Sequence, residues 1–434
     1  MTAGSLTTLY SNENTIFCLN PQITYFKSVF RKYSKFVITD YHHTSTDNNS
    51  FSDSMPDMTF HFPPAGDLLS KVSLQIELNE TNGVACTKFP HNIGTVLFKN
   101  IQFKYDSLEI DDINSEYINF SSMLNNPKSF NSIYSIDTSG DRNELICNNG
   151  NNYQRVALSG GVFNRGDLFS PPVPIKKMKA IVPIPFSFTK NIGTAFPLFL
   201  LTKKDLSIYI KSSNLKALFS DQDSSEDAIL SKFKFSLIFK YIYLSEEEKN
   251  RFKSSPQEYL LEKVKYGDTI RLYADIKIDF RSVVPNLPVK CIYLVNKSVS
   301  GTLEHDYVEL YNKYEYQFLI KGVNLQQEPL PHEYYSKLNI IDNFKGCVYD
   351  KWYYTTSPLS GSMTSINSNI AYIPLNLKNT EGPSGCINTG TNEFKMTVST
   401  SGHEAQTNIY IYLVYYSIMR ISENQHLNFP YGNI

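Results

Sequence analysis

Residues 233–243 read Phe-Lys-Phe-Ser-Leu-Ile-Phe-Lys-Tyr-Ile-Tyr, with a large apolar or aromatic side chain at every odd-numbered position. Alternate side chains of an extended strand point to opposite faces of a sheet, so this spacing predicts a strand with one face on a core. Residues 270–280 repeat the pattern, and most of the intervening positions are charged. Both stretches indicate strands of a half-buried antiparallel sheet.

The same alternation recurs along the whole chain, at Val72–Leu78, Ile101–Tyr105, Leu206–Ile210 and Ile409–Leu413. Loops rich in Gly, Asn, Ser and Pro separate these stretches, as in β-sandwiches. Aromatic residues make up 14% of the chain, with 30 Tyr and 28 Phe, and both types favour strands. The sequence therefore predicts a mainly-β protein whose aromatic strands form sandwich cores, rather than stacking platforms for single-stranded nucleic acid or sugar.

Helices are expected to be few and short. Asn20-Pro21 supplies an N-cap followed by proline, and residues 23–35 then carry apolar side chains at helical spacing. Ser245–Glu248 is a capping box with acidic residues in the first turn. Four basic residues of the first helix form a face that we interpret as solvated, with contact to anionic lipid or a neighbouring protein as the alternative. They are Lys27, Arg31, Lys32 and Lys35.

The polar, acidic run Ser220–Asp227 separates two strand-rich halves of about 200 residues each, a size that suits one decorated sandwich. On this basis we expect an N-terminal arm at residues 1–19, a first domain at 20–219, a linker at 220–230 and a second domain at 231–434. The two halves show no residue-level repeat. The alternation therefore does not by itself indicate that the two halves have similar folds.

Composition bears on partners and location. Lys plus Arg number 41 and Asp plus Glu 42, so the chain lacks the basic excess of proteins that bind phosphate backbones, and no direct nucleic-acid partner is expected. No stretch approaches the roughly 18 to 20 apolar residues of a membrane span, and residues 1–10 do not read as a secretory signal.

The six cysteines form no C-x-x-C pair, which is typical of reduced, mostly buried thiols. Four N-x-S/T sequons are expected to stay unmodified: Asn48, Asn79, Asn119 and Asn296.

Residues that carry chemistry show no catalytic arrangement. The eight histidines lack H-x-H and H-E-x-x-H spacing, and Gly160-Gly161 lacks the context of a phosphate loop and is expected to be a turn. Cys386 and His403 are the one candidate nucleophile and base, and nothing else in their polar segment supports the pair. Asp111-Asp112 is interpreted as a turn. We predict no enzyme, no catalytic or metal-ligating residues and no cofactor.

A longer stretch points to a family. Asn20-Pro-Gln-Ile-Thr-Tyr-Phe-Lys-Ser-Val-Phe-Arg-Lys-Tyr-Ser-Lys-Phe36 resembles the N-terminal signature of the major capsid proteins of nucleocytoplasmic large DNA viruses. Leu19 and Ser187 stand where that family has glycine and tryptophan. Weaker matches follow in family order almost to the end of the chain. They are Gly66–Leu69, Asn92–Gly94, Pro183–Asn191, Tyr241–Phe252, Ile373–Leu375, Pro383–Gly385 and Leu427–Phe429.

The resemblance implies an all-β chain of two consecutive eight-stranded jelly-roll β-sandwiches with a few short helices and long loops. It implies a structural major capsid protein of a large double-stranded DNA virus, whose homotrimers form pseudo-hexameric capsomers that tile an icosahedral shell. Its partners would be neighbouring capsomers, minor capsid proteins and the surface of an inner viral membrane. Its place would be the virion capsid, after assembly in the host cytoplasm. A minor or scaffold-like double jelly-roll paralogue and a jelly-roll glycan-binding module remain as alternatives.

Overall fold

The computed structural model forms two compact units, residues 1–36 and 37–434. The predicted helix at 23–35 falls outside the described residues except for 32–35, which are not helical. Within the described residues no helix is long and apolar enough to cross a membrane. The described residues are 32–44, 57–62, 64–78, 97–106, 108–125, 133–136, 142–147, 175–201, 205–213, 233–272, 276–280, 286–298, 314–344, 370–377, 383–390, 393–400, 407–422 and 427–431.

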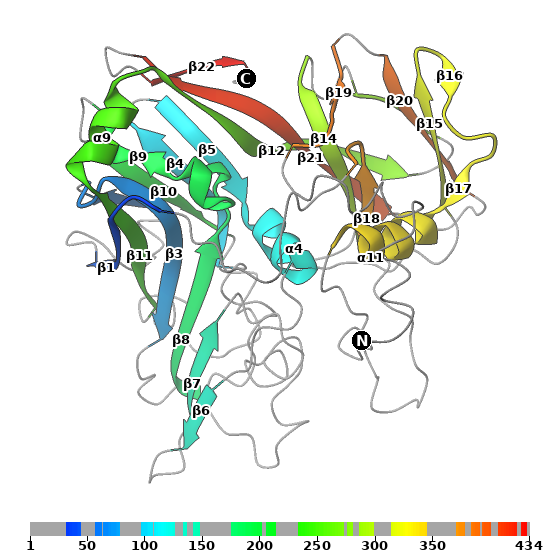
Figure 1. Ribbon diagram of the computed structural model, residues 1–434. Helices are drawn as coiled ribbons and strands as arrows, with labels where there is room; N and C mark the ends of the chain where they lie inside the picture. The colour runs from blue at the N-terminus through cyan, green and yellow to red at the C-terminus, as the bar shows by residue number, and fades with distance from the viewer. Residues whose placement is uncertain are drawn as a thin grey trace, which may run out of the picture. The chain divides into compact units, whose positions relative to one another are not determined.

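Two sheets form a first sandwich (Figure 1). One sheet has the order β1 (Phe36–Thr44), β11 (Phe233–Leu244), β3 (Leu68–Leu78), β8 (Ile175–Ile184), β7 (Arg142–Cys147) and β6 (Ile133–Ile136), with β9 (Phe196–Pro197) paired to β3. The other has the order β2 (Asp57–Phe62), β10 (Leu206–Ser212), β4 (Phe98–Tyr105) and β5 (Leu108–Asn114).

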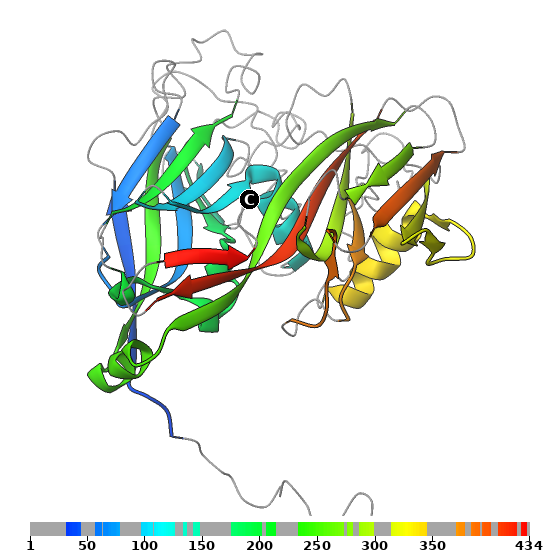
Figure 2. The same cartoon turned by 90° about the horizontal axis from the view of Figure 1, so that it is seen from above.

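Two further sheets form a second sandwich, and Figure 2 shows its longest strands, β12 and β21, lying side by side. One sheet has the order β12 (Gln257–Leu272), β21 (Thr407–Ile421), β14 (Pro288–Ser298) and β18 (Ile370–Pro374), with β19 (Ile387–Asn388) and β22 (Leu427–Tyr431) attached. The other has the order β13 (Ile276–Asp279), β20 (Phe394–Thr400), β15 (Tyr314–Ile320) and β16 (Val323–Asn324), with β17 (Leu330–Pro331) paired to β15.

The two sandwiches share one strand order. In the first, the principal strands in chain order are β1, β2, β3, β4, β5, β8, β10 and β11, and in the second they are β12, β13, β14, β15, β16, β18, β20 and β21. Numbered one to eight in each case, they form one sheet of order 1-8-3-6 and one of order 2-7-4-5. This is the double-sheet arrangement of a jelly roll. The prediction of two consecutive eight-stranded jelly rolls is therefore confirmed, and the repeat that the residues do not show is present in the topology.

Strand β11 completes the first jelly roll. It pairs with β3 from Phe233↔Leu78 to Ile242↔Leu68. The expected second domain spans residues 231–434, whereas this pairing puts residues 233–244 in the first sandwich. The acidic run at 220–227, which lies outside the described residues, precedes the last strand of a jelly roll and does not follow it. Strand pairing thus favours a domain boundary at helix α9 (Glu246–Lys253).

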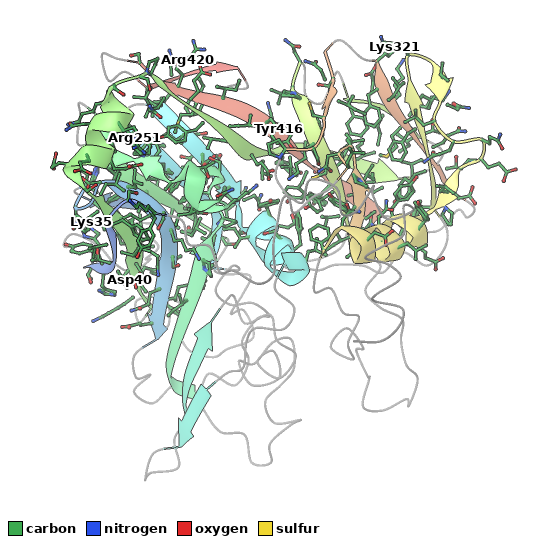
Figure 3. All side chains as sticks on the ribbon, in the orientation of Figure 1. Lys35, Asp40, Arg251, Lys321, Tyr416 and Arg420 are labelled. Atoms are coloured by element: carbon green, nitrogen blue, oxygen red, sulfur yellow. The ribbon has the colours of Figure 1, made fainter. Side chains whose placement is uncertain are left out.

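The alternating stretches lie on the cores as predicted. Phe235, Leu237 and Phe239 of β11 are fully buried, and the Phe239 ring stacks on Phe62 of β2 at a centroid distance of 4.4 Å. Gly66, in one of the family-like segments, is fixed by the same core. A Cβ atom at Gly66 would lie 2.6 Å from the Cβ of Tyr241, so only glycine fits there without a shift. Figure 3 shows how densely side chains fill the interior of each sandwich.

Short helices follow the fifth strand of each jelly roll: α4 (Ser115–Asn125) in the first, and η6 (Tyr334–Leu338) with α11 (Asn339–Asn343) in the second. The predicted helix after Ser245 is confirmed as α9, although the Ser245 side chain makes no capping hydrogen bond. Instead, Lys249 of α9 forms an ion pair with Asp67 at 3.1 Å. Asp67 also accepts the Leu244 N–H at 2.8 Å, which ties the end of β11 to the start of β3.

Candidate assembly site

Helix α4 packs the first jelly roll against the second (Figure 1). The ring of Phe120 lies 5.1 Å from Tyr293 on β14 and 5.2 Å from Tyr412 on β21, measured between centroids. The Tyr412 hydroxyl donates a short hydrogen bond to the Glu116 carboxylate of α4. Each aromatic pair of this kind contributes about 0.5–1.5 kcal/mol beyond its buried area. The apolar core of the first sandwich therefore continues across this seam onto the outer face of the second sandwich's β12–β21–β14–β18 sheet.

Strand β21 is buried on both faces because of this arrangement. Ile411 and Leu413 face the core of the second sandwich, whereas Tyr412 and Val414 belong to the cluster that α4 joins. An antiparallel strand with solvent on one side would alternate with polar residues. The long apolar run of the last clear strand in the sequence thus reflects a second layer packed on its outer face.

A charged cluster closes the seam beside α4. Lys190, from the loop after β8, donates to the backbone carbonyl of Glu262 on β12 at 3.1 Å and lies 3.7 Å from its carboxylate. Lys290 on β14 forms an ion pair with the same carboxylate at 2.5 Å. Burial lowers the pKa of Lys190, but the Tyr117 hydroxyl and the Glu262 carboxylate outweigh burial, and the net pKa is raised. One acid is therefore shared between a lysine from each jelly roll.

Asp111 lies on β5 and is buried. Its Oδ2 accepts hydrogen bonds from the backbone N–H of Ser187 at 2.8 Å and from the Ser187 hydroxyl at 2.6 Å. Burial raises the pKa of this carboxyl, while Lys263 and the two Ser187 hydrogen bonds oppose the shift. The expected turn at Asp111-Asp112 is wrong, since both residues belong to a strand. Ser187, which departs from the tryptophan of the family pattern, is the partner that satisfies a buried acid.

Lys263 of β12 faces these acids from the other jelly roll. Its ammonium lies 3.8 Å from the centroid of the Phe429 ring on β22, a cation–π distance. Burial lowers the pKa of Lys263, and the carboxylates of Asp111 and Glu109 oppose that effect. A cleft of about 380 Å³ opens here between β4, β5 and β10 on one side and β12 and β21 on the other. Lysines and carboxylates both line it, so its chemistry is that of a domain seam rather than of a site selective for one ligand charge.

The other candidates from the sequence are described only in part. Cys386 is exposed, and His403 lies outside the described residues, as do Gly160-Gly161. Among the described residues no group of three or more His, Cys, Asp or Glu side chains could hold a metal ion. Asn296, the one sequon whose side chain is described, is fully buried, so it could not accept a glycan in the folded chain.

The basic residues near the N-terminus are described only in part. Lys27 and Arg31 lie outside the described residues, whereas Lys32 and Lys35 are exposed in a non-helical stretch. These two residues are exposed as expected, but they do not lie on the expected helix. Within the described residues the cluster thus provides no built binding site.

Comparison with known proteins gives the family. Residues 24–245, just over half of the 434, match the family described as major capsid protein N-terminus. The chain belongs to this family. A curated member, the major capsid protein of Pyramimonas orientalis virus, is 25% identical over 288 residues, which cover 66% of this chain and 63% of that protein. The chain thus spans less than two thirds of the length of that relative, and about half of capsid protein 1 of Acanthamoeba polyphaga mimivirus.

Solved structures of the family support the fold. VP54 of PBCV-1 superposes with a TM-score of 0.64 at 15% identity, covering 94% of this chain and all of VP54. The Faustovirus major capsid protein superposes with a TM-score of 0.58 at 10% identity, covering 92% of each chain. The family resemblance noted in the sequence is confirmed. The fold is thus shared where few residues are identical.

Proposed function

We propose that the chain is a structural major capsid protein of a large double-stranded DNA virus, forming homotrimeric, pseudo-hexameric capsomers that tile an icosahedral shell. One observation carries the proposal: the chain repeats a single topology, 1-8-3-6 over 2-7-4-5, in two consecutive jelly rolls. Three such chains in a closed ring present six similar lobes, which match the six neighbours of a hexagonal lattice. In this role the chain acts through its shape and its contacts with other capsid subunits, without catalysis or a cofactor.

The partners follow from that role. Copies of the chain would contact each other within the trimer, and trimers would contact neighbouring capsomers and minor capsid proteins in the virion shell. The exposed Lys32 and Lys35 ahead of β1 are suited to anionic headgroups of an inner viral membrane. Direct contact with nucleic acid is not expected from a formal net charge of −1. Assembly would take place in the host cytoplasm.

The test is the mass of the purified protein by light scattering, followed by negative-stain imaging of the same peak. The chain mass is 49.6 kDa, so a trimer weighs three times 49.6, or about 149 kDa. A stable species of that mass with six lobes supports the capsomer. A monomer with glycan affinity would overturn it and favour the binding module. Quantifying the protein in purified particles separates a major shell protein from a minor or scaffold-like paralogue, which would be scarce or absent.

A further inference from the structure

The seam inside the chain joins two edge strands. Strand β5 is the last strand of its sheet, β12 is the first strand of its own, and the two lie in contact. Helix α4, which directly follows β5, packs on the sheet that begins with β12. The first jelly roll thus presents its fifth strand and following helix to the first strand and outer sheet face of the second.

The repeated topology defines the equivalent surfaces that this contact leaves unused. The equivalent of β5 is β16, and the equivalent of β12 is β1. Both are edge strands in the described sheets, and an exposed edge is a ready template for another chain. Helices η6 and α11 occupy the place of α4. Each chain therefore has two surfaces that are equivalent to the two sides of its internal seam. The surface at β16 corresponds to β5, and the surface at β1 corresponds to β12.

Both unused surfaces expose apolar side chains. On β1, Val37, Ile38 and Tyr41 are 60%, 45% and 41% exposed. Val323 of β16 and Leu325 directly after it are 66% and 56% exposed. Lys321 and Gly322, with φ of 51° and 77°, make the turn that projects this hairpin, and Lys321 is labelled in Figure 3. Tyr334 and Leu338 of η6 add exposures of 39% and 54%. Exposed apolar side chains of this kind are suited to a contact with another protein.

The chemistry of the used and unused surfaces differs. At the internal seam the β5 acids Glu109 and Asp111 face Lys263 of β12, so the two edge strands match by charge, while α4 supplies the apolar contacts. At the unused surfaces each side offers exposed apolar groups, Val323 on β16 and Ile38 on β1, among polar neighbours that include Asn324 and Asp40. Pairing β5 with β1, or β16 with β12, would bury carboxylates or a lysine against apolar groups, which is costly. This cost favours pairing of β16 with β1.

We propose that β16 and η6 of one copy dock on β1 of a second copy. This contact between chains would be equivalent to the contact within each chain, where β5 and α4 pack on β12 and its sheet. The inference rests on the proposed capsomer and adds its contact residues. The contact is head-to-tail, because the docking surfaces are different parts of the chain. A head-to-tail contact either closes into a ring or extends into a filament. Three copies, each already spanning two of six positions, close the ring.

The test uses charge at the two surfaces. Val323→Asp and Ile38→Lys each place a charge in the apolar contact and are expected to raise the concentration at which the trimer dissociates by at least about tenfold. The double variant Val323→Asp/Ile38→Lys puts opposite charges together at every contact and is expected to restore assembly. Leu377→Asp, at a residue 87% exposed outside both surfaces, is the matched control and should leave the mass unchanged.

The outcomes separate the two proposals. A wild-type protein that is not a trimer overturns the proposed capsomer. A wild-type trimer that Val323→Asp and Ile38→Lys leave as stable as Leu377→Asp overturns the docking surfaces and leaves the capsomer standing. Dissociation by the single variants with recovery in the double variant supports both. Circular dichroism of each variant checks that the chain remains folded, which is expected because Val323 and Ile38 are exposed.

Discussion

The hydroxyl and the backbone N–H of Ser187 both donate to one oxygen of Asp111, 76 positions earlier in the chain. Ser187 follows the last-but-two principal strand of the first jelly roll, and Asp111 lies on its edge strand β5. Leaving a buried carboxylate without donors is costly, so this pair fixes the loop after β8 against β5. The same loop carries Lys190, whose contacts with Glu262 reach the second jelly roll. The Ser187 hydrogen bonds therefore position part of the domain seam.

Replacing Ser187 by alanine removes the hydroxyl donor and keeps the backbone donor. We expect Ser187→Ala to lower the free energy of unfolding by about 1–3 kcal/mol, the usual cost of an under-satisfied buried acceptor. Chemical denaturation followed by tyrosine fluorescence measures it. Ser207→Ala on β10, at a half-buried serine, should cost far less. Equal losses in the two variants would show that the Asp111 contact is not special.

The pH dependence of stability should report on Asp111. Burial raises its pKa in the folded chain above the ordinary aspartate value of 3.8, so the folded state binds the proton more tightly than the unfolded state does. This contribution favours the folded state at low pH and is lost as pH rises through the folded-state pKa. Asp111→Asn removes it, so the stability of Asp111→Asn relative to wild type should increase from pH 4 toward pH 7. Denaturation at both pH values, with exposed Asp205→Asn as control, tests the sign, and a flat difference would contradict it.

Gly66 tests the packing of the first core. Gly66→Ala introduces a Cβ 2.6 Å from the Cβ of Tyr241 on β11, and neither atom is at the end of a flexible side chain. We expect a loss of about 1–3 kcal/mol in the free energy of unfolding, as for other overpacked sites. Gly193→Ala is the matched control, because its nearest neighbour would be the Asn191 Oδ1 at 3.5 Å. A Gly66→Ala chain as stable as Gly193→Ala would show that β11 can move away.

Phe120 tests the seam between the jelly rolls. Its ring is fully buried between Tyr293 and Tyr412 of the second sandwich. Truncation to alanine should cost about 3–5 kcal/mol, since it leaves a cavity in a core shared by both domains. Leu377→Ala, at an exposed position, should have little effect on the same thermal melt. If Phe120→Ala melted at the wild-type temperature, the sandwiches would not be held together by α4.

The sequence predicted the alternating strands and their buried faces because a period of two is a local signal. The alternating face of residues 233–243 shows what this local signal predicts and what it does not predict. Its burial was predicted, whereas its partner β3 was not, because the two strands pair across more than 150 residues. The acidic run before it therefore has the sequence pattern of a domain linker. Nothing local distinguishes a loop before the last strand from a loop between domains.

Helix α4 and strand β5 were missed for related reasons. Helix α4 has a local signal that was overlooked: the Glu116 N–H donates to Asn114 Oδ1 at 2.9 Å, an N-terminal cap before an acidic first turn. Asp111-Asp112 resembled a turn because acids are uncommon in strands. Ser187, which makes a buried acid tolerable there, is remote in sequence. The candidate seam likewise depends on contacts between residues of different domains, which alternation alone does not predict.

The position of β11 between β1 and β3 also sets when the first jelly roll can form on a ribosome. Until residues 233–244 have been synthesised, β3 lacks one neighbour and β1 lacks the strand that holds it in the sheet. A nascent chain released earlier would expose two open strand edges, which favour aggregation. The chain must therefore be made as far as residue 244 before its first domain can close. A cell that produces many copies at once would hold many such unfinished edges, so supply of folded subunits depends on translation running past α9.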